Sequence, residues 1–188
     1  MLTQGPELNV GARVRELRHA LGMSVRTLAT KTDFSPSFVS QVENGQASPS
    51  IASLERLARA LGVSLVEFFA APEQTRAIVL RAGEAPELRS TWSRAQIRAL
   101  GPGGPRSRLE PMLITLEPGG LSGKHPSASA GDTFAFIVEG EVTLTLAESQ
   151  HVLRRGDAIT LTADVPYRWE NTSNVAAQIL SVSTRPPG

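Results

Sequence analysis

Apolar residues recur at two different spacings along the chain, and the spacing changes near residue 76. In the first part they stand three or four positions apart, as in Val14, Leu17 and Leu21, or in the stripe that begins at Ile51. This period is typical of helices that bury one face. In the second part, short runs rich in Val, Ile, Thr and Leu are separated by turn residues. The pattern therefore predicts a helical region followed by a region of β-strands.

Five short helices are predicted between residues 8 and 69, because serines and glycines punctuate the helical pattern. A serine before a helix can accept hydrogen bonds from N–H groups of the first turn, and a glycine after it favours termination. Pro36 fits the first position of the third helix, where no N–H group is needed. The predicted starts are Ser24, Ser35, Ser50 and Ser64, and the predicted stops are Gly22, Gly45 and Gly62.

The region after residue 76 is predicted to be all-β, with a helix considered only around 89–98. Many short strands with turn signals predict a β-sandwich or barrel. The candidate strands are 77–80, 112–116, 133–138, 141–146, 157–162 and 177–182. The fold class is thus α+β with two domains. Its expected parts are a flexible N-terminus (1–7), a helical domain (8–70), a linker (71–76) and a β-domain (77–188).

The composition excludes some chemistry and names no partner. The formal net charge is +1, so binding to nucleic acid would depend on local placement of charge. The absence of cysteine excludes disulfides and thiolate metal sites. The first residues lack the basic start and apolar run of a signal peptide, and no apolar stretch approaches the ~20 residues that span a bilayer. We expect a soluble, cytoplasmic protein with no membrane contact.

The segment between the second and third helices predicts a helix-turn-helix. Asp33 is one of the few residues besides glycine that tolerate the left-handed backbone conformation that such a turn needs. On the third helix, Val39 and Val42 are three positions apart and are expected to face the core. The other side of this helix is then left for contact with solvent or a partner.

The outer face of the third helix, formed by Ser37, Ser40 and Gln41, is small and uncharged. Small hydroxyl side chains allow a helix to enter deep into the major groove, and glutamine can make a bidentate contact with adenine. Asn44 and the N–H groups at helix starts suit phosphate oxygens. A plain helical bundle explains the same spacing equally well, so the spacing alone leaves DNA binding open.

The stretch from Val14 to Phe69 resembles the lambda-repressor-like (Xre-type) helix-turn-helix domain. The matching segments are the start of the second helix (24–29), SFVSQVENG and LERLARALGVSL, although family members often have glycine in place of Asp33. The resemblance implies binding to double-stranded DNA through the helix after the turn, with Val25, Arg26 and Asn44 at the DNA backbone. The full set of implied DNA-binding residues is Val25, Arg26, Ser35, Pro36, Ser37, Ser40, Gln41 and Asn44.

The second half resembles the cupin fold, a double-stranded β-helix. EPGG (117–120), IVEGEVTL (137–144) and LRRGDAITLTADVPYRWEN (153–171) carry this resemblance, while 86–108 matches weakly. Together, the two halves resemble bacterial transcriptional regulators that join an Xre-type domain to a cupin domain.

Metal-dependent cupins carry histidines and a glutamate at four positions, and this chain has none of them there. Hydroxyl groups are poor ligands for transition metals. Asp132 lies one position away, where strand alternation points it to the other face. His125 is the one histidine near the expected pocket mouth, and a lone histidine is more typical of a surface or hydrogen-bonding role. We predict no metal site, no cofactor and no catalytic residues. The four corresponding positions are Ser127, Ser129, Thr133 and Tyr167.

Without a metal, the barrel interior is expected to hold a small organic effector. Alternate residues on two strands would face inward and supply hydroxyls, an indole and an apolar wall. The alternative is that Tyr167 and Trp169 fill the barrel as core, so that the domain serves mainly to dimerise. The predicted pocket residues are His125, Ser127, Ser129, Thr133, Ala135, Tyr167, Trp169 and Asn171.

These inferences combine into one functional hypothesis with two rivals. The chain is expected to be a homodimeric, DNA-binding transcriptional regulator that acts on a near-palindromic site under the control of a small effector. The family resemblance favours a repressor. One rival is a cupin enzyme with a vestigial helix-turn-helix domain. The other is a constitutive DNA binder whose cupin domain only dimerises.

Overall fold

The computed structural model describes residues 9–69, 79–81, 83–101 and 107–185. Within these residues five helices come first and nine strands follow, as the change in spacing predicts. None of the helices in the described part of the chain is long and apolar enough to span a membrane. The helices are α1 (Val10–Ala20), α2 (Val25–Thr32), α3 (Pro36–Glu43), α4 (Ile51–Ala60) and α5 (Leu65–Phe69).

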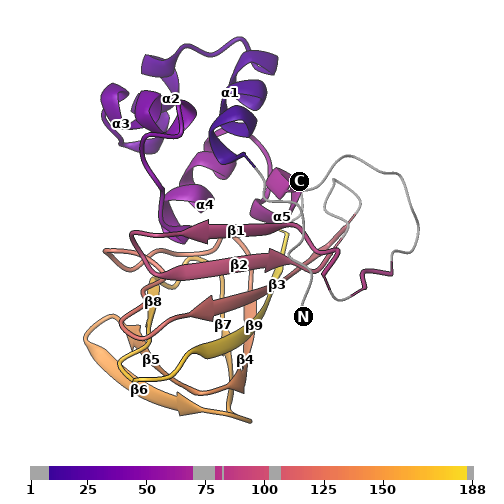
Figure 1. Cartoon of the computed structure of the whole chain (residues 1–188), viewed down its shortest axis with the longest axis vertical. Coiled ribbons are helices and arrows are strands. Elements are labelled where there is room, and N and C mark those ends of the chain that lie inside the picture. Colours follow the sequence, from indigo (N-terminus) through magenta and orange to yellow (C-terminus); the bar gives the residue numbers. More distant parts are fainter. Residues whose placement is uncertain (1–8, 70–78, 82, 102–106, 186–188) are drawn as a thin grey trace.

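The strands form two antiparallel sheets that enclose a common core below the helices (Figure 1). One sheet has the order β1-β2-β3-β9-β4-β7, and the other has the order β6-β5-β8. Leu116, Ile137, Leu144 and Trp169 come from both sheets, and each is at most 1% exposed. The strands are β1 (Glu87–Ser90), β2 (Ala95–Ala99), β3 (Leu109–Leu116), β4 (Thr133–Glu139), β5 (Glu141–Leu146), β6 (Ser149–Arg154), β7 (Ala158–Leu161), β8 (Tyr167–Glu170) and β9 (Ala177–Thr184).

The four predicted serine caps are all present. Ser24, Ser35 and Ser50 each accept a hydrogen bond from an N–H group in the first turn of the following helix. Ser64 and Glu67 bond reciprocally: the Ser64 hydroxyl accepts from Glu67 N–H at 3.0 Å, and the Glu67 carboxylate accepts from Ser64 N–H at 2.8 Å. These side chains satisfy N–H groups that have no partner within their own helix.

The sequence pattern missed three strands, and two of its assignments are wrong. β1, β2 and β6 were not predicted, whereas β8 is the strand that was expected to carry Tyr167 and Trp169. The segment 89–98 is not a helix but part of the β1–β2 hairpin. Val79 and Leu80 form no strand, while 77–78 lie outside the described residues. The burial of β2 alternates along the strand. Short strands of this kind have too few apolar positions to stand out as a period of two.

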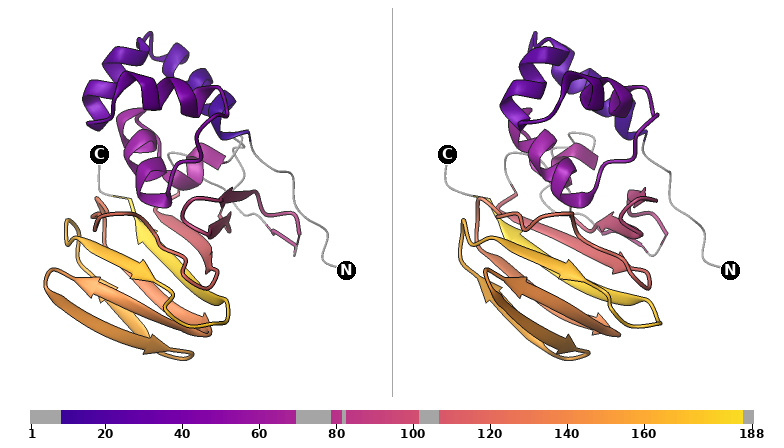
Figure 2. Two further views of the ribbon diagram at one scale, coloured as in Figure 1. Left: turned by 60° about the vertical axis from the view of Figure 1, so that its left-hand side comes forward. Right: turned by 90° about the vertical axis from the view of Figure 1, so that its left-hand side faces the viewer.

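The helices rest on one end of the barrel, with α4 close to the strands (Figure 2). The Ala52 N–H group of α4 donates to the Ser122 carbonyl at 3.2 Å. Two turns further along α4, the Arg59 guanidinium donates to the Ala128 carbonyl at 2.7 Å. Helix α4 therefore contacts the loop between β3 and β4 at two points.

Glu55 lies on the same helix and is partly buried against the β-region. Burial raises its pKa to about 7, the charge of Arg59 opposes this, and the charge of Glu110 adds to it. Burial also raises the pKa of Tyr167 on β8, and the Glu55 carboxylate raises it further against a hydrogen bond from Thr133. Helix α4 thus places the Glu55 carboxyl beside the barrel, at a cavity that both line.

We predict that the fold loses stability as pH rises through about 7, because the buried Glu55 must then become charged. Its folded-state pKa lies above the ordinary value of about 4.3, so folding takes up a proton between these values and stability falls as pH rises. Thermal unfolding of the full chain between about pH 5 and 8 measures this, and Glu55→Gln should flatten the fall. The exposed Glu16→Gln is the control. An unchanged slope in Glu55→Gln would contradict the assignment.

Candidate nucleic-acid interface and ligand sites

The turn between α2 and α3 has the geometry expected of a helix-turn-helix. Asp33 ends α2 in the left-handed conformation, with φ 54° and ψ 37°. Ser35 then starts α3, with its hydroxyl accepting from Phe38 N–H at 3.1 Å, and Pro36 occupies the first turn. Aspartate, asparagine and glycine are the residues that adopt this left-handed conformation most readily. Asp33 therefore fits the turn as predicted.

Helix α3 has one buried face and one exposed face. Val39 and Val42 are at most 1% exposed and pack into the helical core. None of the eight predicted DNA-binding residues is buried, so the surface that is expected to contact DNA is not buried in the rest of the protein. Val25 and Ser40 are partly buried, and Arg26, Ser35, Pro36, Ser37, Gln41 and Asn44 are exposed. Their contact with DNA stays a prediction.

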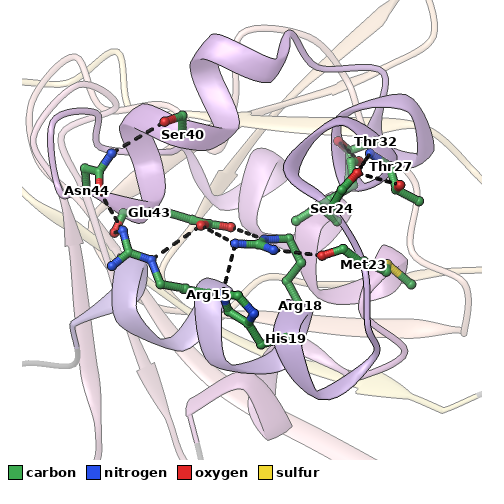
Figure 3. Close-up of polar contacts among 11 residues, drawn as sticks. Arg15, Arg18, His19, Met23, Ser24, Thr27, Thr32, Ser40, Glu43 and Asn44 are labelled. Carbon is green, nitrogen blue, oxygen red and sulfur yellow. Dashed lines mark hydrogen bonds and ion pairs between the residues drawn. The ribbon is translucent and has the colours of Figure 1, made fainter.

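A buried ion pair fixes α3 against α1 (Figure 3). Arg18 of α1 donates to both carboxylate oxygens of Glu43 at the end of α3, at 2.6 Å and 2.9 Å. The two side chains are only 8% and 4% exposed. Arg18 also donates to the Met23 carbonyl at 2.7 Å, which ties the loop before α2 to the same pair. Because a two-point contact fixes orientation as well as distance, this pair sets how α3 lies in the domain.

Arg15 is a functional candidate that the sequence pattern did not identify (Figure 3). Its guanidinium donates to the side-chain oxygen of Asn44 at 2.6 Å and to the Glu43 carbonyl at 3.1 Å. The Asn44 amide in turn donates to the Ser40 hydroxyl at 3.4 Å. Arg15 thus places a positive charge beside the predicted DNA-binding surface. It was missed because its partner Asn44 is 29 positions away along the chain.

The environment of Glu43 favours its charged form. Burial by itself would raise its pKa, but the hydrogen bonds and charges of Arg18 and Arg15 outweigh burial, so the pKa of Glu43 lies below its usual value. Gly11 shows how closely α1 approaches α3, since a Cβ atom at this position would lie 2.4 Å from the Val42 carbonyl oxygen. Charge and close backbone packing therefore act together to hold the helix.

The barrel interior contains part of the predicted ligand pocket. Thr133, Ala135 and Ile137 are at most 1% exposed, so alternate residues of β4 face inward as expected. Trp169 is 1% exposed and meets Tyr167 edge-on, with 6.1 Å between ring centroids. The interior is thus lined by the side-chain types that were predicted, and the two aromatic rings pack against each other there.

Asn171, another predicted pocket residue, is buried and holds a loop. Its amide donates to the Leu116 carbonyl at 2.8 Å and to the Val175 carbonyl at 2.7 Å. Its oxygen accepts from the N–H and the hydroxyl of Ser173 at 2.9 Å and 2.8 Å. These bonds use both amide hydrogens and both oxygen lone pairs. The bonding pattern therefore gives Asn171 a structural role, and contact with a ligand stays a prediction.

The remaining predicted pocket residues lie at cavities between the helices and the barrel. His125 and Ser127 line a cleft of about 690 Å³. Ser129 lines a neighbouring cavity of about 330 Å³, together with Glu55 and Arg185. Neither of these two cavities is lined by the barrel-interior residues named above. The eight predicted residues are therefore distributed over three places, and their role in ligand binding stays a prediction.

The expectation for Asp132 is confirmed. Its side chain is exposed, and its carboxylate accepts from Ala163 N–H at 3.0 Å, so it points away from the buried Thr133 beside it. Within the ranges that the structure describes, no group of three or more His, Cys, Asp or Glu side chains is placed to hold a metal ion. The absence of a metal and of a cofactor stays a prediction.

The chain is similar over nearly its whole length to proteins of one architecture. Residues 9–69 match the family model of a helix-turn-helix domain, and residues 112–183 match that of the cupin domain. The HTH-type transcriptional regulator PuuR of Escherichia coli (strain K12) is 28% identical over 93% of this chain and 94% of its own length. The HTH-type transcriptional regulator SutR of the same strain is 24% identical over 84% of each chain.

A solved structure has the same arrangement. The crystal structure of an HTH_3 family transcriptional regulator from Vibrio cholerae is similar with a TM-score of 0.74 at 25% identity, covering 95% of this chain and 96% of that one. The order of a helical domain before a cupin domain is thus confirmed at the level of fold.

We predict that Glu43→Ala lowers the free energy of unfolding by about 3–5 kcal/mol, because it leaves the buried charge of Arg18 without its partner. Denaturant titration of the full chain measures this. The control is Glu16→Ala, since Glu16 is 68% exposed in its pair with Arg13; its loss should cost at most about 1 kcal/mol.

The effect of Glu43→Ala should also depend on pH. Since the pKa of Glu43 is depressed in the folded state, its contribution is present above the ordinary value of about 4.3 and is lost as pH falls below it. The stability difference between Glu43→Ala and the unaltered chain should therefore shrink in acid. A difference that is constant over this range would contradict the ionic role.

Proposed function

We propose that this chain, a member of the Xre-type helix-turn-helix regulators with a C-terminal cupin domain, binds a specific DNA duplex and regulates transcription. The observation that carries the proposal is the outer face of α3. Ser37 and Gln41 are exposed and Ser40 partly so, on a helix that the Arg18–Glu43 pair fixes in position. A surface so small, uncharged and rigidly held suits insertion between two phosphate backbones.

In the proposed complex, α3 lies in the major groove. Gln41 makes a bidentate contact with adenine, and the serines accept from or donate to several bases. Arg26 at the start of α2 and Arg15 beside Asn44 neutralise phosphates on either side of the groove. The N–H groups in the first turns of α2 and α3 add weaker phosphate contacts.

A homodimer would place two copies of α3 in successive major grooves about 34 Å apart on a near-palindromic site. We assign DNA binding to residues 8–70, with 71–76 as the linker, and dimerisation and ligand binding to residues 77–188. Phe134 and Val138, which are 43% and 37% exposed on β4, are candidate residues for a dimer contact through the cupin domain.

A small organic effector would control DNA binding through the contacts between α4 and the barrel. Because the two binding equilibria are linked, such an effector must prefer one placement of the helix-turn-helix domains over another. Repression is the mode that we favour, on the resemblance to the family alone.

The rival from another class is a cupin enzyme, and a specific measurement separates it from a regulator. The positions that hold metal in enzymatic cupins carry serine, threonine and tyrosine in this chain. Elemental analysis of the purified protein is the discriminating experiment. Stoichiometric iron, zinc or manganese would favour the enzyme.

Selection of bound fragments from a pool of random duplexes tests the proposed function. We expect enrichment of a near-palindromic sequence whose half-sites lie about one helical turn apart, because a two-fold symmetric dimer presents two copies of α3. Recovery of no preferred sequence at moderate ionic strength would overturn the proposal.

We predict that Gln41→Ala weakens specific binding by about 1–3 kcal/mol and leaves nonspecific binding unchanged, because the amide contacts a base edge. Titration of labelled duplexes, one with the selected site and one without it, measures both affinities. Equal losses on the two duplexes would show that Gln41 does not recognise a base.

Arg26→Ala is the matched comparison, because Arg26 is expected at a phosphate. It should weaken binding to both duplexes and lower the slope of log affinity against log salt by about one unit. An unchanged slope would argue against the phosphate contact and leave the role of Gln41 unaffected.

A further inference from the structure

A sizeable cavity lies between the two domains, lined by residues of both. This cleft, of about 690 Å³, has one wall made by the turn before α3, by α3 itself and by the start of α4. The other wall is made by residues 91–92, between β1 and β2, and residues 124–127, between β3 and β4. Its volume falls in the range of about 300–1,000 Å³ that is usual for small-molecule sites.

The walls of the cleft are aromatic on both sides. Phe34 and Phe38 pack edge to face with 5.0 Å between ring centroids, on the helical side. Trp92 lines the same cleft from the β side and is 55% exposed. A large exposed indole in a cleft that two phenyl rings also line is an apolar surface that a ligand body would cover.

The charges that line the cleft have a single sign. Arg56 of α4 and Lys124 line it, together with the imidazole of His125, and no aspartate or glutamate does. Lys124 is one of only two lysines in the chain, and its side chain is exposed. A site with cationic groups at its edge and an apolar interior is complementary to a molecule that has an anionic group on an apolar body.

We propose that this cleft binds a small amphipathic organic anion, with its aromatic or aliphatic body between Trp92 and Phe38 and its anionic group at Arg56 and Lys124. The inference rests on the proposed function for its regulatory meaning, since it makes the cleft the effector site. It differs from the sequence-based expectation, which placed the effector inside the barrel.

Arg56 connects the cleft to the DNA-binding surface. Its guanidinium lies over the Phe34 ring at 5.3 Å and donates to the carbonyl of Thr32, the last residue of α2, at 3.4 Å. An anion that binds Arg56 therefore acts on the turn that orients α3. A ligand held by both walls also favours the placement of the helices against the barrel in which the walls face each other.

The test uses the full chain and the fluorescent anion 8-anilinonaphthalene-1-sulfonate, with the uncharged N-phenyl-1-naphthylamine as the matched probe. We expect saturable binding of the anion and binding of the uncharged compound weaker by about tenfold or more, since one lost ionic contact of 1.4 kcal/mol has this effect. Equal affinities would overturn the anionic specificity of the site.

Three variants locate the probe. Lys124→Glu should weaken binding of the anion by about tenfold, because one charge contact is lost. It should leave binding of the uncharged compound unchanged. Lys31→Glu changes the other lysine, which is exposed on α2 outside the cleft, and should leave both affinities unchanged. Trp92→Ala should weaken binding of both compounds by the same factor. Undiminished binding of the anion to Lys124→Glu would overturn the site.

The regulatory role has a separate readout. With the selected duplex, saturating sulfonate probe should change DNA affinity, and the duplex should change probe affinity by the same factor, because the linkage is reciprocal. Binding in the cleft with no change in DNA affinity would overturn the effector role. Duplex selection could fail while the probe still binds and still responds to the variants. That outcome would count against the proposed function and support the ligand site.

Discussion

The proposed DNA-binding surface lies on a helix that one buried ion pair holds in place. Arg18 and Glu43 join α1 to the end of α3, and the same arginine holds the loop before α2. Burying two charges costs solvation, and their two-point contact offsets this cost only in one geometry. Ser37 and Gln41 are exposed on the helix that this pair holds in place. Arg15, next to the pair, extends the positive surface towards the proposed path of the phosphates.

Helix α4 is the element that contacts both the helical core and a loop of the barrel. Its apolar stripe, including Leu54 and Leu57, belongs to the helical core. Its polar residues face elsewhere: Arg56 bonds to the end of α2, Arg59 bonds to a loop of the barrel, and Glu55 acts on a tyrosine in the barrel. Helix α4 is thus bonded both to the helical core and to a loop of the barrel.

The sequence predicted the helical half almost completely and the β half only in part. Helix caps and the left-handed turn at Asp33 depend on neighbours within a few positions, so they can be predicted from the residue types at those positions. Several strands of the barrel also stand out, because short runs rich in Val, Ile, Thr and Leu, such as β5, are typical of strands. The short β1–β2 hairpin was missed, since its polar residues on one face resemble a loop. The predicted pocket was divided because Asn171 turned out to hold a loop and His125 lies between the domains.

The sequence by itself determined the local elements, the order of the domains and the small outward face of α3. The tertiary structure decided which residues from distant parts of the chain are in contact. Arg18 finds Glu43 25 positions away, and the cleft joins Phe38 to Lys124 across the domain boundary. Periodicity and capping act over one or two turns of chain, so they can be inferred from adjacent residues. Charge pairing and cavity shape depend on the three-dimensional approach of distant segments, which no local pattern contains.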